Sequence, residues 1–286
     1  MNKIEGIILD WAGTTVDFGC FAPVNAFLET FRKAGIEVTV EEARTPMGML
    51  KKDHIGAMLR MPRIGQLWKE KYNRAFDEED INELYRNFEP LMLASIKEFT
   101  DPLPHVPDIA AVLRSMGLKI GSTTGYTDIM MDIVVSSAKE KGYVPDFIIT
   151  PDSTDSFGRP FPYMIFRNIE ALRITAPWKT VKVGDTAADI QEGINGGVWS
   201  VGVIVGSSEM GLKLEEYEAL PETDRQNAIS RARDAFMRAG ADFTIESIKE
   251  LPELINKING LLEENKRPNT YKMVIDEKEK NNDWKI

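Results

Sequence analysis

Apolar runs of strand length recur along the chain, and helix-like stretches separate them. Residues 4–9 form the first run, and others lie at 118–124, 147–150, 180–184 and 199–205. Such alternation is typical of a parallel sheet with helices on both of its faces. The pattern therefore predicts an α/β fold with a Rossmann-like parallel sheet at its core.

One long segment, from Ala22 to Glu98, interrupts this alternation because it holds no convincing strand pattern. Its apolar residues instead follow the helical period, for example from Glu78 to Phe99. A Pro-rich stretch at 101–107 has the stiff composition of a linker that returns to the sheet, and an outgoing linker is expected around 17–22. We expect an all-helical lid that is hinged over the sheet and excludes water when it closes.

The predicted domain organisation follows from these boundaries. The end of the chain is dense in Lys, Glu, Asp and Asn, which indicates a solvated extension rather than part of the core. We expect an α/β core domain of residues 1–20 and 101–264, a helical cap domain of residues 21–100, and a charged C-terminal extension of residues 265–286.

Composition narrows the possible partners. The formal net charge of −10 gives no general attraction to nucleic acid or to anionic membranes, so local cations must hold any anionic substrate. No apolar run reaches the ~20 residues of a membrane span, and no signal-like stretch precedes the first strand. The single Cys excludes an internal disulfide and suits a reducing compartment. A cytoplasmic location is expected.

The most informative short motif follows the first apolar run. Asp10 stands at the carboxyl end of that predicted strand, where open α/β sheets place their ligands. Gly13, Thr14 and Thr15 come shortly after it. The carboxylate is a candidate nucleophile, and the amides and hydroxyls beside it can hold an oxyanion.

This motif resembles the first motif of the haloacid dehalogenase-like phosphotransferases. A second match is the run from Val181 to Asp189, an apolar strand that ends in Gly-Asp-Thr and carries another acid one helical turn later. The resemblance implies that Asp10, the carbonyl of Ala12 and Asp185 bind Mg²⁺, which prefers hard oxygen ligands. Two roles stay open for Asp189: support of the metal site, or an ordinary first-turn acid favoured by the helix dipole.

Two weaker motifs lie between these. Thr124 ends the second apolar run and matches the position whose hydroxyl binds a phosphoryl oxygen, although Ser and Thr at strand ends commonly cap the next helix. Arg159 precedes a helix-like run and matches the position whose cation neutralises the phosphoryl group. An isolated Arg is usually a surface residue. The order of the motifs along the chain favours the functional interpretation of both.

One position departs from the superfamily pattern. Most of its phosphatases carry a second Asp two residues after the nucleophile, and that acid protonates the leaving oxygen. Here the residue is Ala12. Together with the run from Pro46 to His54, this variant resembles the phosphonoacetaldehyde hydrolase family. The likeness covers nearly the whole chain except the charged tail.

The resemblance implies that Lys51, in this run, forms a Schiff base with the substrate aldehyde. Departure from a C–P bond would otherwise leave an unstabilised carbanion, and an iminium accepts those electrons. No oxygen leaves, so no acid is needed at position 12. Lys51 must be neutral to attack, against an ordinary pKa near ~10.4. Burial and the adjacent Lys52 are both expected to favour the neutral amine.

His54 follows Lys51 by three residues, which predicts that both lie on one face of a helix. It is a candidate proton shuttle during imine formation, although a lone His is more often structural. The resemblance also implies a pocket around the substrate, for which ordinary packing is the alternative explanation at the Cys and Met positions. The residues concerned are Cys20, Met47, Gly48 and Tyr126.

The function implied by the resemblance is hydrolysis of phosphonoacetaldehyde to acetaldehyde and phosphate, with Mg²⁺ as cofactor, by a homodimer. The nearest alternative is a phosphatase of small phosphate monoesters, against which Ala12 stands. A dehalogenase is a second alternative, and it would need no metal. A non-catalytic module that binds phosphorylated ligands is the third, and the intact set of Asp10, Asp185 and Lys51 argues against it.

Overall fold

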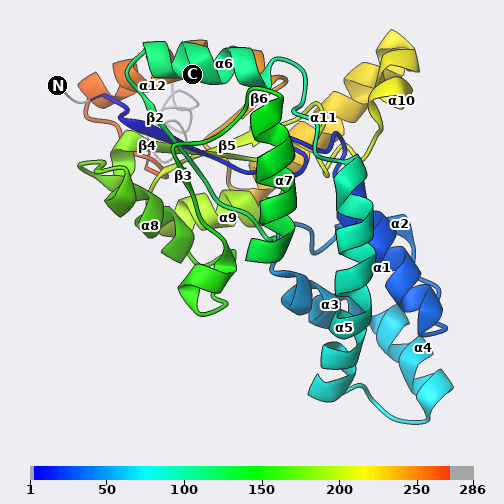
Figure 1. Cartoon of the computed structure of the whole chain (residues 1–286). Coiled ribbons are helices and arrows are strands. Elements are labelled where there is room, and N and C mark those ends of the chain that lie inside the picture. Colours follow the sequence, from blue (N-terminus) through cyan, green and yellow to red (C-terminus); the bar gives the residue numbers. More distant parts are fainter. Residues whose placement is uncertain (1–2, 271–286) are drawn as a thin grey trace, which may run out of the picture.

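The computed structural model describes residues 3–270, and a six-stranded parallel sheet forms its centre (Figure 1). The strands lie in the order β3-β2-β1-β4-β5-β6. Their bounds are β1 (Gly6–Leu9), β2 (Lys119–Ser122), β3 (Phe147–Ile148), β4 (Thr180–Gly184), β5 (Trp199–Val203) and β6 (Phe243–Ile245).

The central strands are buried along their whole length, as continuous apolar runs require. All four residues of β1 are buried, and Ile7 pairs with Ile120 of β2 on one side and with Val181 of β4 on the other. The sheet confirms the predicted α/β class. Sequence periodicity missed β6, because its three residues are too few to establish a pattern.

Helices cover both faces of the sheet (Figure 1). One face is covered by α6 (Val106–Ser115) and α12 (Leu251–Glu263), and the other by α8 (Tyr163–Ala171) and α9 (Ala187–Gly196). The remaining helices of this part are α7 (Asp128–Glu140), α10 (Leu214–Ala219) and α11 (Glu222–Ala239), with short 3₁₀ turns η2 (Pro151–Thr154), η3 (Pro177–Lys179) and η4 (Ile248–Glu250).

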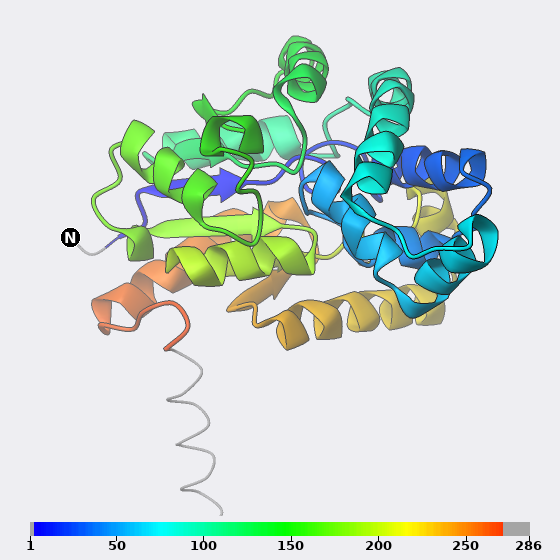
Figure 2. The same cartoon turned by 90° about the horizontal axis from the view of Figure 1, so that it is seen from below.

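Five further helices lie between β1 and β2 in the sequence, and we call them the helical insertion. They pack together beside the carboxyl ends of the strands (Figures 1 and 2). The predicted helix from Glu78 ends earlier than expected, at Ser95, and continues as the 3₁₀ turn η1 (Ile96–Glu98). The members are α1 (Phe21–Lys33), α2 (Val40–Arg44), α3 (Lys51–Leu59), α4 (Pro62–Tyr72) and α5 (Glu78–Ser95).

The two linkers of the helical insertion run side by side. Leu103 N donates to Thr15 O at 2.8 Å, and Val16 and Pro102 form an antiparallel bridge. Asp17 then starts α1, since its two carboxylate oxygens accept hydrogen bonds from Phe21 N and Ala22 N at 2.9 and 3.0 Å. The domain boundaries at residues 20 and 100 stay a prediction from sequence.

The predicted charged extension, residues 265–286, falls largely outside the described residues. Its first part packs on the core instead of projecting into solvent: Pro268 is buried, and the Arg267 guanidinium carbon lies 4.0 Å from the centre of the Trp178 ring. Within residues 3–270, none of the helices combines the length and the apolar character that crossing a membrane requires.

Candidate active site

The carboxyl ends of β1, β2 and β4 meet at one place, where the strand order changes direction. Asp10 follows β1, Thr124 lies shortly after β2, and Asp185 follows β4. In sheets of this kind ligands bind at such a crevice. A small cavity lies there, and ten of the residues predicted from sequence line it: Asp10, Ala12, Cys20, Met47, Gly48, Lys51, Thr124, Tyr126, Arg159 and Asp185.

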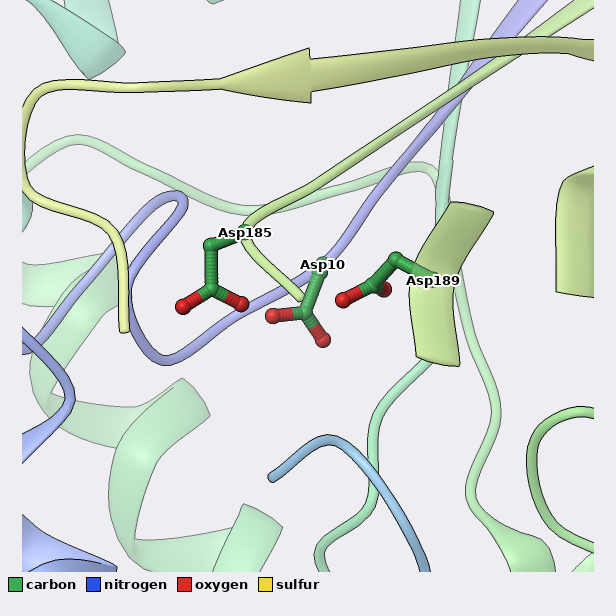
Figure 3. Close-up of side chains that lie close together, drawn as sticks. All are labelled: Asp10, Asp185 and Asp189. Carbon is green, nitrogen blue, oxygen red and sulfur yellow. The ribbon is translucent and has the colours of Figure 1, made fainter. Parts of the chain in front are cut away.

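Three carboxylates converge beside this cavity, and two of them, Asp10 and Asp185, line it. Asp10, Asp185 and Asp189 are buried, each offers an oxygen within 4.8 Å of the others, and their side chains point toward one another (Figure 3). Gly13 has a φ of 87°, and a Cβ there would overlap the Asp185 carboxylate, so only glycine lets this loop pass so close. The cluster could hold a divalent metal ion.

Burial raises the pKa of Asp10 and of Asp185, and in each case neighbouring carboxylates add to the effect. The pKa of Asp185 is raised well above its usual range. The hydrogen bond that Ser208 N donates to Asp185 Oδ2 at 2.8 Å lowers this pKa, but burial outweighs it. Arg159 works against this shift at Asp10. Carboxylates held so close together repel one another unless a cation lies between them.

Asp189 differs from the other two acids because both of its oxygens already have partners. Lys182 Nζ donates to Oδ1 and Thr186 Oγ1 donates to Oδ2, each at 2.6 Å. Burial would raise the pKa of Asp189, but Arg159 and Lys182 outweigh it and hold that pKa below its usual value. The contacts favour a supporting role for Asp189 over direct coordination, which remains a proposal.

The charges at the site do not balance without a further cation. With Lys51 neutral and all four buried carboxylates ionised (Asp10, Asp185, Asp189 and Glu192), two buried cations (Arg159 and Lys182) leave a formal charge of −2. Uncompensated charge of this size is unfavourable in a buried site. One divalent ion would restore neutrality, so the donor set fits a metal such as the one predicted.

Arg159 faces the nucleophile candidate. Its Nη2 donates to Asp10 Oδ1 at 2.5 Å, and its Nη1 lies 3.0 Å from Asp189 Oδ1. The surrounding carboxylates, Asp10 foremost, raise the pKa of Arg159 against the opposing effect of burial. Thr124 lines the cavity from the other side, and its Oγ1 accepts a hydrogen bond from Tyr126 N at 3.1 Å. Arg159 is thus a fully buried cation rather than a surface residue.

Lys51 reaches the same cavity from the helical insertion. It is the first residue of α3 and is 2% exposed, and its Nζ lies 4.9 Å from the centre of the Tyr126 ring. Among residues 3–270, its side chain has no hydrogen bond or ion pair. Burial is the main cause that lowers the pKa of Lys51, and Arg159 lowers it further. The positive end of the α3 dipole also disfavours an ammonium at this position.

The expectation for Lys52 is wrong. Its side chain points away from the cavity and forms an ion pair with Glu78 at 2.9 Å on the partly exposed side of α3. Consecutive residues of a helix lie about 100° apart, so neighbours in sequence face different environments. Arg159 is the cation that acts on Lys51.

His54 lies behind Lys51 on α3 and is fully buried, but it does not line the cavity. Its Nε2 lies 2.8 Å from Ala43 O and therefore carries the hydrogen, which leaves an unshared pair on Nδ1. Nδ1 has no partner among the described residues. Burial and Lys51 together hold the pKa of His54 well below its usual value, so the ring is neutral.

The remaining pocket residues come from both parts of the chain. Gly48 abuts Thr186, Tyr126 covers Lys51, and Met47 lines the cavity beside them. Burial raises the pKa of the Cys20 thiol well above its ordinary value, so this thiol is protonated. The helical insertion thus closes the cavity from above.

A further contact joins the helical insertion to the side of the site that holds Asp185. Arg44 Nη1 of α2 donates to Gly19 O at 2.7 Å and to Ser208 Oγ at 3.2 Å. Ser208 also donates its backbone N–H to Asp185. Sequence reasoning missed this connection, because its members lie far apart along the chain.

Three further buried polar residues were also missed: Thr123, Lys182 and Glu192. Two of them left a signal in the sequence. Lys182 is a cation inside the apolar strand β4, and Glu192 lies three residues after Asp189, on the same face of α9. A charged residue inside a buried strand is unusual enough to indicate a buried partner.

Comparison with known proteins agrees with this geometry. Residues 4–197 match the family model described as haloacid dehalogenase-like hydrolase. A protein from Lysinibacillus sphaericus named phosphonoacetaldehyde hydrolase is 56% identical over 257 residues, which cover 90% of this chain and 96% of that protein.

Two other relatives are informative. A Clostridioides difficile protein named bifunctional phosphonoacetaldehyde hydrolase/aminoethylphosphonate transaminase is 50% identical, and the match covers 90% of this chain but 40% of that longer protein. Among solved structures, a phosphonoacetaldehyde hydrolase-like protein from Oleispira antarctica superposes with a TM-score of 0.89 at 38% identity, covering 93% of this chain and 96% of that one.

Proposed function

The chain belongs to the haloacid dehalogenase-like hydrolases, and we propose that it hydrolyses the C–P bond of phosphonoacetaldehyde to give acetaldehyde and phosphate. Relatives with this name are 46–56% identical to it over most of its length. The observation that carries the proposal is the position of Lys51: a buried amine without an ion-pair partner among the described residues lines the same cavity as Asp10.

Lys51 prepares the substrate in the proposed mechanism. Its neutral amine adds to the aldehyde carbonyl and expels water, which leaves a protonated imine. Burial supports this step because it lowers the pKa of Lys51 and keeps more of the amine neutral. His54 is proposed to move protons during this exchange through Nδ1, and Tyr126 packs over the reacting nitrogen.

Asp10 then attacks phosphorus in line with the C–P bond. As the bond between the carboxylate oxygen and phosphorus forms, the C–P electron pair moves into the iminium and gives an enamine. Arg159 and Thr124 are proposed to hold the phosphoryl oxygens. Protonation of the enamine carbon and hydrolysis of the imine release acetaldehyde, and a second water cleaves the aspartyl phosphate.

Asp10, Asp185 and the carbonyl of Ala12 are proposed to hold Mg²⁺, with Asp189 in support. A bound Mg²⁺ would neutralise charge on the phosphoryl group and on the carboxylates. Ala12 fits this chemistry, because the leaving group is a carbon that the imine stabilises and not an oxygen that needs a proton. We also propose that the protein is a homodimer, as the family resemblance implies, and that it acts in the cytoplasm.

The test is simultaneous measurement of phosphate and acetaldehyde from phosphonoacetaldehyde with Mg²⁺, beside a panel of small phosphate monoesters. We expect equimolar products from the phosphonate and little phosphate from the panel. Phosphate from the monoesters alone would instead indicate a phosphatase with an acid outside the expected position. Binding of these ligands without turnover of any would indicate a non-catalytic module.

A further inference from the structure

Glu192 and its neighbours form a buried polar cluster behind Arg159 that the proposed mechanism does not use. Glu192 and Lys182 are both fully buried, and Thr123 is buried beside them. Removing two charged side chains from water is expensive unless each finds good partners. The way in which these three residues contact Arg159 indicates what they do.

The guanidinium of Arg159 is held along one edge. Its Nε donates to Glu192 Oε2 at 3.0 Å, and its Nη2 donates to Thr123 Oγ1 at 2.8 Å. Thr123 Oγ1 in turn donates to the same Glu192 oxygen at 2.9 Å, which closes a ring of contacts around that edge. A planar guanidinium held at Nε and at Nη2 has a fixed plane.

The opposite end of the guanidinium faces the reacting groups. The second N–H of Nη2 points to Asp10 and Nη1 lies beside Asp189. Lys182 supports the anchor from below, since its Nζ bonds Asp189 at 2.6 Å and lies 3.6 Å from Glu192 Oε2. One edge of the guanidinium is therefore held by Glu192 of α9 and by Thr123 after β2, and the opposite end faces Asp10.

We propose that Glu192, with Thr123, is a positioning residue that fixes the plane of the Arg159 guanidinium, so that Nη1 and Nη2, which face Asp189 and Asp10, meet the phosphoryl oxygens as phosphorus transfers to Asp10. The proposal rests on the proposed function, because it assigns Glu192 an effect on that same transfer. Donors that are already oriented need no rearrangement in the transition state. A displacement of a reacting group by about 1 Å can lower the rate about 100-fold.

A double-mutant cycle tests this coupling. Glu192→Leu removes the anchor, and Arg159→Lys keeps the positive charge but has no guanidinium edge to hold. We expect Glu192→Leu to lower kcat/KM by about 10-fold to 100-fold in the wild-type background, and by less than about 3-fold in the Arg159→Lys background. The inhibition constant of inorganic phosphate should rise with the first loss. The proposal would be overturned if Glu192→Leu lowered kcat/KM equally in both backgrounds, or if it left the inhibition constant of inorganic phosphate unchanged.

Two further variants separate charge from geometry. Glu192→Gln keeps an acceptor for Arg159 Nε, so it should lose little activity. The double variant Thr123→Val/Glu192→Gln also removes the contact between Thr123 and Arg159 Nη2, so it should lose more activity than Glu192→Gln alone. These variants decide the question if Glu192→Leu does not fold. Glu5→Gln is the matched control, since the Glu5–Lys179 ion pair lies at the amino ends of β1 and β4, away from the site.

A wild-type protein without turnover would contradict the proposed function and not this inference. Calorimetric binding of inorganic phosphate with Mg²⁺ then takes the place of kinetics in the same cycle. Phosphate affinity that falls in Glu192→Leu only when Arg159 is present supports the positioning role, and affinity that is independent of Glu192 overturns it.

Discussion

Gly48 of the helical insertion lies so close to Thr186 of the sheet domain that a Cβ on Gly48 would overlap the Thr186 hydroxyl. Gly48 also has a φ of 88°, which L side chains rarely adopt. A similar approach occurs at Gly125, where a Cβ would come within 2.6 Å of Met49 O. Neither approach leaves room for a Cβ, so a larger residue at position 48 or 125 would push the insertion away from the cavity.

Gly48→Ala should therefore hold the insertion open. We expect kcat/KM to fall about 100-fold, since the amine of Lys51 would be displaced from the aldehyde. Steady-state kinetics measures the loss. Gly260→Ala is the control: no heavy atom lies within 4 Å of its added Cβ, so it should leave activity unchanged and stabilise α12 by about 0.5–1 kcal/mol. Wild-type activity in Gly48→Ala would contradict the closure argument.

Lys51→Arg keeps a positive charge but cannot form an imine. We expect turnover of phosphonoacetaldehyde to fall below about one thousandth of the wild-type value. Borohydride reduction in the presence of acetaldehyde should label Lys51 in the wild type and leave the variant unlabelled, as mass spectrometry of peptides would detect. Lys52→Arg should change activity by less than about twofold, because the ion pair that it forms with Glu78 is partly exposed. Substantial turnover by Lys51→Arg would end the Schiff-base assignment.

Ala12→Asp introduces the acid that most phosphatases of the superfamily carry at this position. The added carboxylate lies in a cavity that already holds Asp10 and Asp185, so it should weaken attack by Asp10 on the phosphonate by at least about 10-fold. A departing alkoxide would gain a proton donor. We expect the ratio of ethyl phosphate turnover to phosphonate turnover to rise about 10-fold or more. An unchanged ratio, compared with Ala12→Gly, would mean that position 12 does not separate the two reactions.

Asp185→Asn should make the metal-free protein more stable and weaken its response to Mg²⁺. Burial and the nearby carboxylates raise the pKa of Asp185 well above its usual range, so its charge destabilises the metal-free protein. Removing that charge should raise the metal-free Tm by roughly 2–8 °C. Mg²⁺ should raise the Tm of the wild type by mass action and leave that of the variant nearly unchanged. Calorimetry with and without Mg²⁺ measures both, and an equal Mg²⁺ response in the two proteins would exclude Asp185 as a ligand.

Asp17 gives a prediction of pH dependence. Burial raises its pKa to about 7, despite two hydrogen bonds from the start of α1. Between its unfolded pKa near ~3.9 and this value the folded state holds the extra proton, so stability falls as pH rises. Relative to Asp17→Asn, the wild type should lose about 1.4 kcal/mol per pH unit between pH 5 and 6.5. A pH-independent difference in free energy of unfolding, from urea titrations, would contradict the raised pKa.

The sequence predicted the parts of the site that a single strand end or a single helix turn determines. Asp10 and Asp185 follow buried apolar runs, so periodicity placed them at strand ends, whereas Lys51 was identified through the family resemblance. His54 lies on the same helix as Lys51 but does not line the cavity. For Glu192 the sequence offered only its spacing from Asp189 on α9. Its importance depends on contacts with Arg159 and Thr123, which lie 33 and 69 residues away along the chain and meet it only after the sheet has formed.

Orientation was also harder to predict than position. Lys52 was expected to act on Lys51 because the two are adjacent in sequence, yet it points toward Glu78. The short strand β6 carries too few residues for an alternating pattern. Helix geometry explains the first error, and the length of the strand explains the second.

The paired linkers at Val16 and Pro102 have a consequence for how such a protein can change over time. The helical insertion enters and leaves at adjacent points, so a recombination event could exchange it as one piece without disturbing the strand ends. Lys51 would depart with that piece, whereas Asp10 and Asp185 would stay. The proposed nucleophile can thereby be inherited separately from the amine proposed to bind the aldehyde, so a descendant could gain a new substrate by replacing the insertion alone.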